Sequence, residues 1–168
     1  MSELERQLKG LDISKMKMSN GKTLEQNLKS EAKRLMNCIQ KRIDEYYNSY
    51  SPNFYKRTYR FKRSMFLAED ILTVHVKNNT ISISIKFNES LAYHPTLWGA
   101  KSQVYVPLLI NDGWCWDGYN GEEDHFRKYS GFHFIEKGIA DFNQNNKFNL
   151  KIKLSKTWEG QKYEDEWY

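Results

Sequence analysis

The chain has 168 residues, of which 39% are hydrophobic and 28% are charged, and its formal net charge is +5. This balance excludes a disordered or low-complexity chain, and the length predicts one domain that can bury a core without a metal or a disulfide. Two cysteines, Cys38 and Cys115, are too few for a disulfide framework, so we expect free thiols. The first residues lack the apolar run of a signal peptide, and no apolar stretch approaches the roughly 18 residues of a membrane span. We therefore expect a protein made in the cytoplasm, with no membrane partner.

Charge is unevenly distributed along the chain. Residues 29–63 hold ten bases against three acids, a net charge of +7, whereas residues 159–168 hold one base against four acids. A basic middle and an acidic end can attract each other between copies of one protein. Ordinary solvated surface explains the same pattern, and both interpretations stay open.

The first predicted elements are a flexible N-terminal arm over residues 1–20 and a long helix after it. Thr23 and Gln26 have the spacing of a capping box, in which the two side chains bond each other's backbone at a helix start. Apolar residues then recur every three or four positions as far as Tyr50, which predicts one amphipathic helix. Pro52 is expected to end it, because proline disfavours helical geometry in the residue before it.

The segment after this helix interleaves aromatic and basic residues. A helical turn is expected at its end, over residues 64–67. Four residues are predicted to form a structural hinge between helix and sheet: Tyr50, Pro52, Tyr55 and Thr58. Five bases are expected to form a subunit or partner interface: Lys56, Arg57, Arg60, Lys62 and Arg63. In the alternative interpretation, the aromatic rings stack on bases and the arginines contact phosphates of single-stranded nucleic acid.

A β-hairpin is predicted next. Residues 71–77 and 80–87 have the composition of strands, and isoleucines alternate with polar residues in the second of them. Asn78 and Asn79 join the two segments, and asparagine tolerates the left-handed backbone that a tight hairpin turn needs.

The middle of the chain is less regular. Residues 103–110 alternate like a strand, but Pro107 interrupts them, which predicts an edge or bulged strand. Residues 111–121 are dense in turn formers and are expected to be a loop. Within this loop, Trp114 and Trp116 are candidates for an exposed docking patch; a loop folded over the core is the equal alternative.

A second, shorter helix is predicted over residues 132–142 and a final strand over residues 147–154. The order of elements predicts an α+β protein, with an antiparallel β-sheet packed by one long N-terminal helix and the shorter helix. We expect a single domain over residues 21–158, followed by an acidic, aromatic C-terminal tail over residues 159–168.

No catalytic constellation is recognisable. The four histidines lack zinc-site spacing, and there is no phosphate-binding glycine loop or nucleophile motif. His125 lies near Glu122 and Asp124, which suggests a metal or acid–base pair, but a solvated loop cluster is the preferred interpretation. We therefore expect no enzyme, no cofactor and no metal.

One motif resembles a known family. The tyrosine-rich segment, followed by a serine and a hydrophobic turn, is similar to a signature of the minor tail-component proteins of tailed bacteriophages, which are tail-completion or head–tail joining proteins. Many relatives in that family have a glycine where this chain has Tyr59. The similarity spans residues 24–155, and its specific part is Tyr46-Tyr47-x-x-Tyr50-x-Pro52-x-x-Tyr55-x-Arg57-Thr58 with Ser64.

The resemblance implies a structural virion protein without enzymatic activity. It implies a homo-oligomeric ring, such as a hexamer, at the junction of neck and tail, with neck or connector and tail-tube proteins as partners and DNA nearby. The alternative function is a nucleic-acid-binding or DNA-mimicking regulator from a mobile element that acts through residues 55–63.

Overall fold

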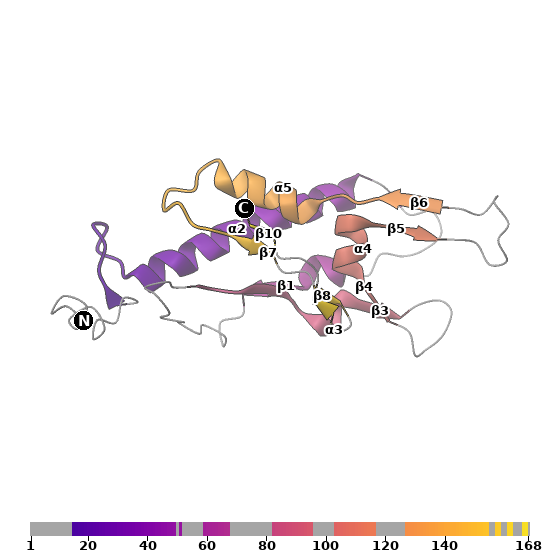
Figure 1. Ribbon diagram of the computed structural model, residues 1–168, viewed down its shortest axis with the longest axis horizontal. Helices are drawn as coiled ribbons and strands as arrows, with labels where there is room; N and C mark the ends of the chain where they lie inside the picture. Colours follow the sequence, from indigo (N-terminus) through magenta and orange to yellow (C-terminus); the bar gives the residue numbers. More distant parts are fainter. Residues whose placement is uncertain are drawn as a thin grey trace. The chain divides into compact units, whose positions relative to one another are not determined.

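The computed structural model describes residues 15–49, 51, 59–67, 82–95, 103–116, 127–154, 157–158, 161–162 and 166–167. Helices and short strands alternate along these residues (Figure 1). The helices are α2 (Leu24–Asn48), the 3-10 turn η2 (Phe61–Arg63), α3 (Glu89–Ala92), α4 (Val106–Asp112) and α5 (Phe134–Asn143). The strands are β1 (Met65–Leu67), β2 (Ile85–Phe87), β3 (Tyr93–Pro95), β4 (Gln103–Tyr105), β5 (Gly113–Trp116), β6 (Arg127–Ser130), β7 (Lys153–Leu154), β8 (Thr157–Trp158), β9 (Gln161–Lys162) and β10 (Glu166–Trp167).

The described strands pair two by two. β3 with β4, β5 with β6, β8 with β9 and β7 with β10 form antiparallel pairs, and β1 with β2 forms a fifth two-stranded sheet. A mixture of helix and strand with a long N-terminal helix and a shorter second one is therefore confirmed. No sheet of more than two strands is found among the described residues, so the single antiparallel sheet stays a prediction.

The chain divides into two compact units, one of Met1–Arg34 with Leu67–Lys86 and the other of Leu35–Phe66 with Phe87–Tyr168. Helix α2 begins in the first unit and ends in the second. The expected domain boundaries, with an arm before the domain and a tail after it, stay predictions.

The start of α2 follows from its local sequence. The backbone N–H of Thr23 donates to Gln26 Oε1 at 3.0 Å, and the N–H of Gln26 donates to Thr23 Oγ1 at 3.2 Å, which confirms the capping box. The residues just before the helix turn back on it, since Lys17 pairs with Thr23. Asn20 donates from Nδ2 to Oδ1 of the buried Asn27 at 2.8 Å. The last residues of the expected arm are thus tied to the first turn of α2.

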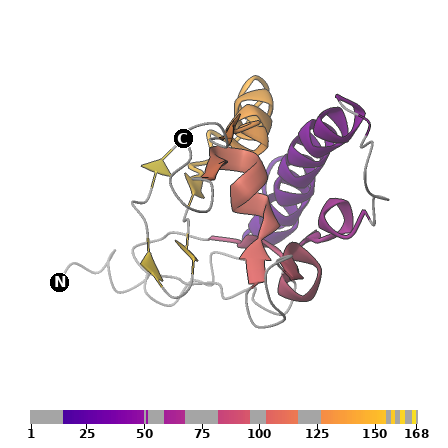
Figure 2. The same ribbon diagram turned by 90° about the vertical axis from the view of Figure 1, so that its right-hand side faces the viewer.

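The core of the second unit lies where α5 packs against the C-terminal half of α2 (Figure 2). At the crossing, a Cβ added to Gly138 of α5 would lie 2.7 Å from Ile39 Cα of α2, so the two backbones touch without an intervening side chain. Aromatic rings of η2 and β2 join this contact, because Phe61 lies 5.5 Å from Phe134 and 5.9 Å from Phe87 between ring centroids. The buried members of the cluster are Ile39, Ile43, Phe61, Phe134, Ile135 and Ile139.

An ion pair borders the same helix contact. Arg42 donates from Nε and Nη2 to the two carboxylate oxygens of Asp141, at 2.7 and 2.6 Å, and from Nη1 to Glu45 at 2.7 Å. These hydrogen bonds hold the pKa of Asp141 below its ordinary value and raise the pKa of Arg42. The side chains of Arg42 and Asp141 are only 26% and 20% exposed, so solvent screens the pair incompletely.

The region between the two main helices differs from the sequence-based expectation. Residues 103–110 were expected to form an edge strand, but only β4 at their start is extended, and α4 follows directly after it. Pro107 lies in the first turn of α4, where its missing N–H costs no helical hydrogen bond. Residues 111–121, which were expected to be a loop, contain β5, and β5 pairs with β6. Tryptophan is a residue type that is enriched in strands.

The remaining elements agree with expectation to different degrees. The second helix is confirmed as α5, and the final strand is confined to β7, which pairs with β10 in the C-terminal tail. The helical turn expected over residues 64–67 occurs earlier, at η2, and is followed by β1. Of the expected hairpin, β2 is described as a strand, whereas residues 71–81 lie outside the described residues.

Candidate functional site

The aromatic and basic segment is described only in its second half. Six of its candidates lie outside the described residues, and so do His125, Glu122 and Asp124. Trp114 and Trp116 belong to β5, where their backbones are opposite Tyr129 and Arg127 of β6. The six undescribed candidates are Tyr50, Pro52, Tyr55, Lys56, Arg57 and Thr58.

The three described bases of this segment contact their own chain. Arg60 donates from Nη2 to the carbonyl oxygen of Ser90 at 2.6 Å, and Lys62 Nζ lies 2.9 Å from Asp44 Oδ1. The Nε of Arg63 donates to the carbonyl oxygen of Tyr59 at 3.4 Å, a distance at which hydrogen bonds are weak. Arg60 and Arg63 are nevertheless exposed, so both present positive charge to the surface.

The aromatic residues of the same segment divide between core and surface. Phe61 is buried, whereas Tyr59 is 45% exposed. Tyr47 of α2 lies between them, with its ring centroid 5.3 Å from that of Tyr59 and 6.3 Å from that of Phe61. Tyr59 has a φ of +54°, in the left-handed region that side chains with a Cβ disfavour.

A second candidate region joins the end of α4 to the start of α5. Asn111 is fully buried there and is hydrogen bonded at both ends of its amide. Its Oδ1 accepts the backbone N–H of Ile135 at 2.9 Å, and its Nδ2 donates to Asp112 Oδ1 at 2.7 Å and to Glu136 Oε1 at 3.0 Å. The backbone adds a further bond from His133 N–H to the Asn111 carbonyl at 2.9 Å. Asn111 thereby caps the first turn of α5 from another helix.

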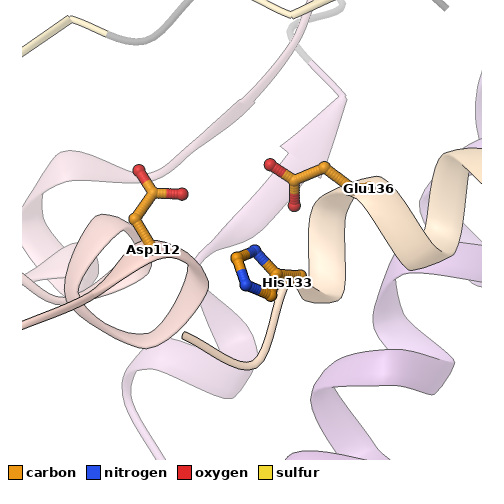
Figure 3. A group of neighbouring side chains, drawn as sticks. All are labelled: Asp112, His133 and Glu136. Carbon is orange, nitrogen blue, oxygen red and sulfur yellow. The ribbon is translucent and has the colours of Figure 1, made fainter. Parts of the chain in front are cut away.

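Three potential metal ligands surround this junction. One ligand atom each from Asp112, His133 and Glu136 lies within 4.8 Å of the others. In Figure 3 the two carboxylates face one another, and the imidazole ring of His133 lies beside the gap between them. Asp112 and His133 are exposed, and Glu136 is half-buried. An imidazole nitrogen and two carboxylate oxygens are a donor set that zinc and similar ions accept.

Sequence reasoning missed this cluster. Asp112 ends one helix and His133 precedes another, and only the packing of α4 on α5 brings them together. The one local signal is the spacing of His133 and Glu136, three residues apart at a helix start, where both side chains reach the same side.

The family of the protein follows from comparison with known proteins. The model of the YomN family matches residues 1–155, and the chain therefore belongs to the YomN family. This family name derives from phages and prophages, which makes the chain a phage-related protein. Neither a search of curated proteins nor a search of solved structures gives a match. Among the described residues, no helix combines the length and the apolar character needed to cross a membrane.

Proposed function

We propose that the protein is a structural component of a phage particle, a tail-completion or head–tail joining protein. It forms a homo-oligomeric ring at the junction of neck and tail, and it contacts neck or connector proteins on one side and tail-tube proteins on the other. The phage-derived family supports the general class. The particular role rests on the resemblance of the tyrosine-rich segment to the tail-completion family.

The backbone at Tyr59 is the observation that carries this proposal furthest. Many tail-completion proteins have a glycine directly after the Arg-Thr of the shared motif, and Tyr59 occupies that position in this chain. Its φ of +54° is one that glycine adopts at no steric cost. A glycine would fit this backbone without strain, so the replacement by Tyr59 is compatible with the resemblance. The order of elements supports the same proposal, since the motif begins in the last turn of the long helix α2, and β2 and α5 follow it.

The exposure of the described bases indicates which of them can meet a neighbouring subunit. Lys62 is paired with Asp44 in its own chain, and Arg60 is bonded to Ser90. Arg60, Arg63 and Tyr59 are all exposed, and we assign the subunit contact to the surface that they form. The acidic C-terminal residues of a neighbour are a chemically suitable partner.

Deleting the gene from its phage tests the proposed role. We expect filled heads and complete tails that remain separate, and restored infectivity when purified protein is mixed with the two parts. Particles that join normally without the protein would contradict the proposal.

A matched pair of variants tests the proposed interface. Arg63→Ala should weaken ring formation in light scattering, whereas Lys33→Ala, which removes the same charge from an exposed position on α2, should not. Equal effects of both variants would attribute assembly to overall charge and contradict a local contact at Arg63. If Arg63→Ala instead weakens a strongly salt-dependent binding to single-stranded DNA, the nucleic-acid regulator is the better account.

A further inference from the structure

The geometry at the α4–α5 junction points to a function that is independent of the proposed assembly role. We propose that Asp112, His133 and Glu136 bind a divalent transition-metal ion, of which Zn²⁺ is the natural probe. The ion would join the last residue of α4 to the first turn of α5.

The types of donor atom select the class of ion. A neutral imidazole nitrogen with two carboxylate oxygens suits zinc and its neighbours, whereas Mg²⁺ and Ca²⁺ prefer oxygen ligands alone. Three protein ligands leave the fourth position of a tetrahedral ion to water or to a group from a partner. This set is therefore typical of an open site.

The distances are close to those that an ion requires. Zinc bonds to nitrogen and oxygen of about 2.0–2.2 Å place tetrahedral ligand atoms about 3.4 Å apart. The three donors lie within 4.8 Å of one another, so they must close in by no more than about 1.4 Å. Asp112 and His133 are exposed, and rotation of their side chains supplies a movement of this size without a shift of either helix.

Asn111 orients the two carboxylates before any ion arrives. Its buried Nδ2 donates to one oxygen of Asp112 and to one oxygen of Glu136. Bonds of this kind behind the ligands fix their direction and raise metal affinity. A cation would also relieve the repulsion between two like charges held at this distance.

A network that serves only to cap α5 would account for Asn111 but not for His133. The side chain of His133 makes no capping hydrogen bond at the α5 N-terminus, although it occupies the N-cap position. Its φ of +53° lies in the left-handed region, which asparagine visits routinely because its short polar side chain can bond to the local backbone. Capping alone would therefore be served better by asparagine at this position, which makes His133→Asn a discriminating variant.

The test uses the full chain after removal of metal with a chelator. Calorimetry with Zn²⁺ and visible spectroscopy with Co²⁺ should reveal one ion per chain, and Zn²⁺ should raise the melting temperature. His133→Asn and Asp112→Asn should each weaken binding at least about tenfold, while His94→Asn, which removes a histidine in β3, should leave it unchanged. In the absence of metal, His133→Asn should be at least as stable as the parent chain.

Two results would overturn the proposal. One is that the parent chain binds neither Zn²⁺ nor Co²⁺ at millimolar concentrations of the ion. The other is unchanged affinity in His133→Asn, which would attribute any binding to other residues. If Asp112→Asn fails to fold, nuclear magnetic resonance of the parent chain still decides the question, because Zn²⁺ must shift the imidazole signals of His133 and leave those of His94 in place.

Discussion

Replacing Gly138 by alanine should separate the two main helices of the second unit. The added Cβ would lie 2.7 Å from Cα and Cγ1 of Ile39 and 2.9 Å from its backbone nitrogen. Two of these three neighbours are backbone atoms, which cannot rotate away, so α5 must move from α2 by several tenths of an ångström. Overpacking of this kind costs about 1–3 kcal/mol. Alanine also favours the helix over glycine by about 1 kcal/mol.

Subtracting the gain of about 1 kcal/mol in helix propensity from the overpacking cost leaves a loss of about 0–2 kcal/mol in the free energy of unfolding. The two backbone contacts place Gly138→Ala near the upper value. Urea unfolding followed by circular dichroism measures it. Ala140→Gly, at an exposed position of the same helix, gives the propensity alone and should cost about 1 kcal/mol. If Gly138→Ala instead stabilises the protein by about 1 kcal/mol, the gain expected from helix propensity alone, the helices do not meet at Gly138 and the described packing is wrong.

Three further substitutions test separate parts of the account. Asp141→Asn should lower stability at neutral pH by about 1 kcal/mol, because it removes a partly buried bidentate ion pair with Arg42. The pKa of Asp141 is lowered in the folded state, so its stabilising contribution is present above the ordinary carboxyl pKa and is lost as pH falls through the lowered value. The difference in the free energy of unfolding between parent and variant, measured with urea, should therefore shrink in acid. A difference that stays constant with pH would contradict the role of this ion pair. Asn111→Ala should cost about 2–3 kcal/mol in the same assay, because it leaves the buried N–H of Ile135 without its acceptor. A loss under about 0.5 kcal/mol, the size of an ordinary surface substitution, would refute the capping role. Tyr59→Gly should be more stable than Tyr59→Ala by about 1 kcal/mol in thermal unfolding, because glycine adopts a left-handed backbone without strain. The reverse order would contradict a left-handed conformation at this position.

Elements defined by neighbouring residues could be predicted from the sequence. The capping box at Thr23 and Gln26 involves residues three apart, and the structure contains both of its hydrogen bonds. Helix α5 was recognisable because its apolar residues repeat with helical spacing. Pro107 was ambiguous, because proline suits both an edge strand and the first turn of a helix, and the surroundings decide between them.

Features that depend on distant contacts could not be predicted. The acceptor role of Asn111 concerns a residue 24 positions away, and nothing in the sequence distinguishes this asparagine from one in a turn. The need for glycine at position 138 arises only from the approach of Ile39 in another helix. The cluster of Asp112, His133 and Glu136 likewise depends on how α4 meets α5, so no sequence motif marks these residues as metal ligands.

We propose that this protein, a member of the YomN family, is a building block of the particle at the junction of neck and tail. Immunogold electron microscopy of purified particles, with quantitative mass spectrometry of the same preparation, tests that claim most directly. We expect label at the neck–tail junction and a small, fixed number of copies per particle. Particles that lack the protein, or that carry it without a fixed copy number or position, would contradict the account.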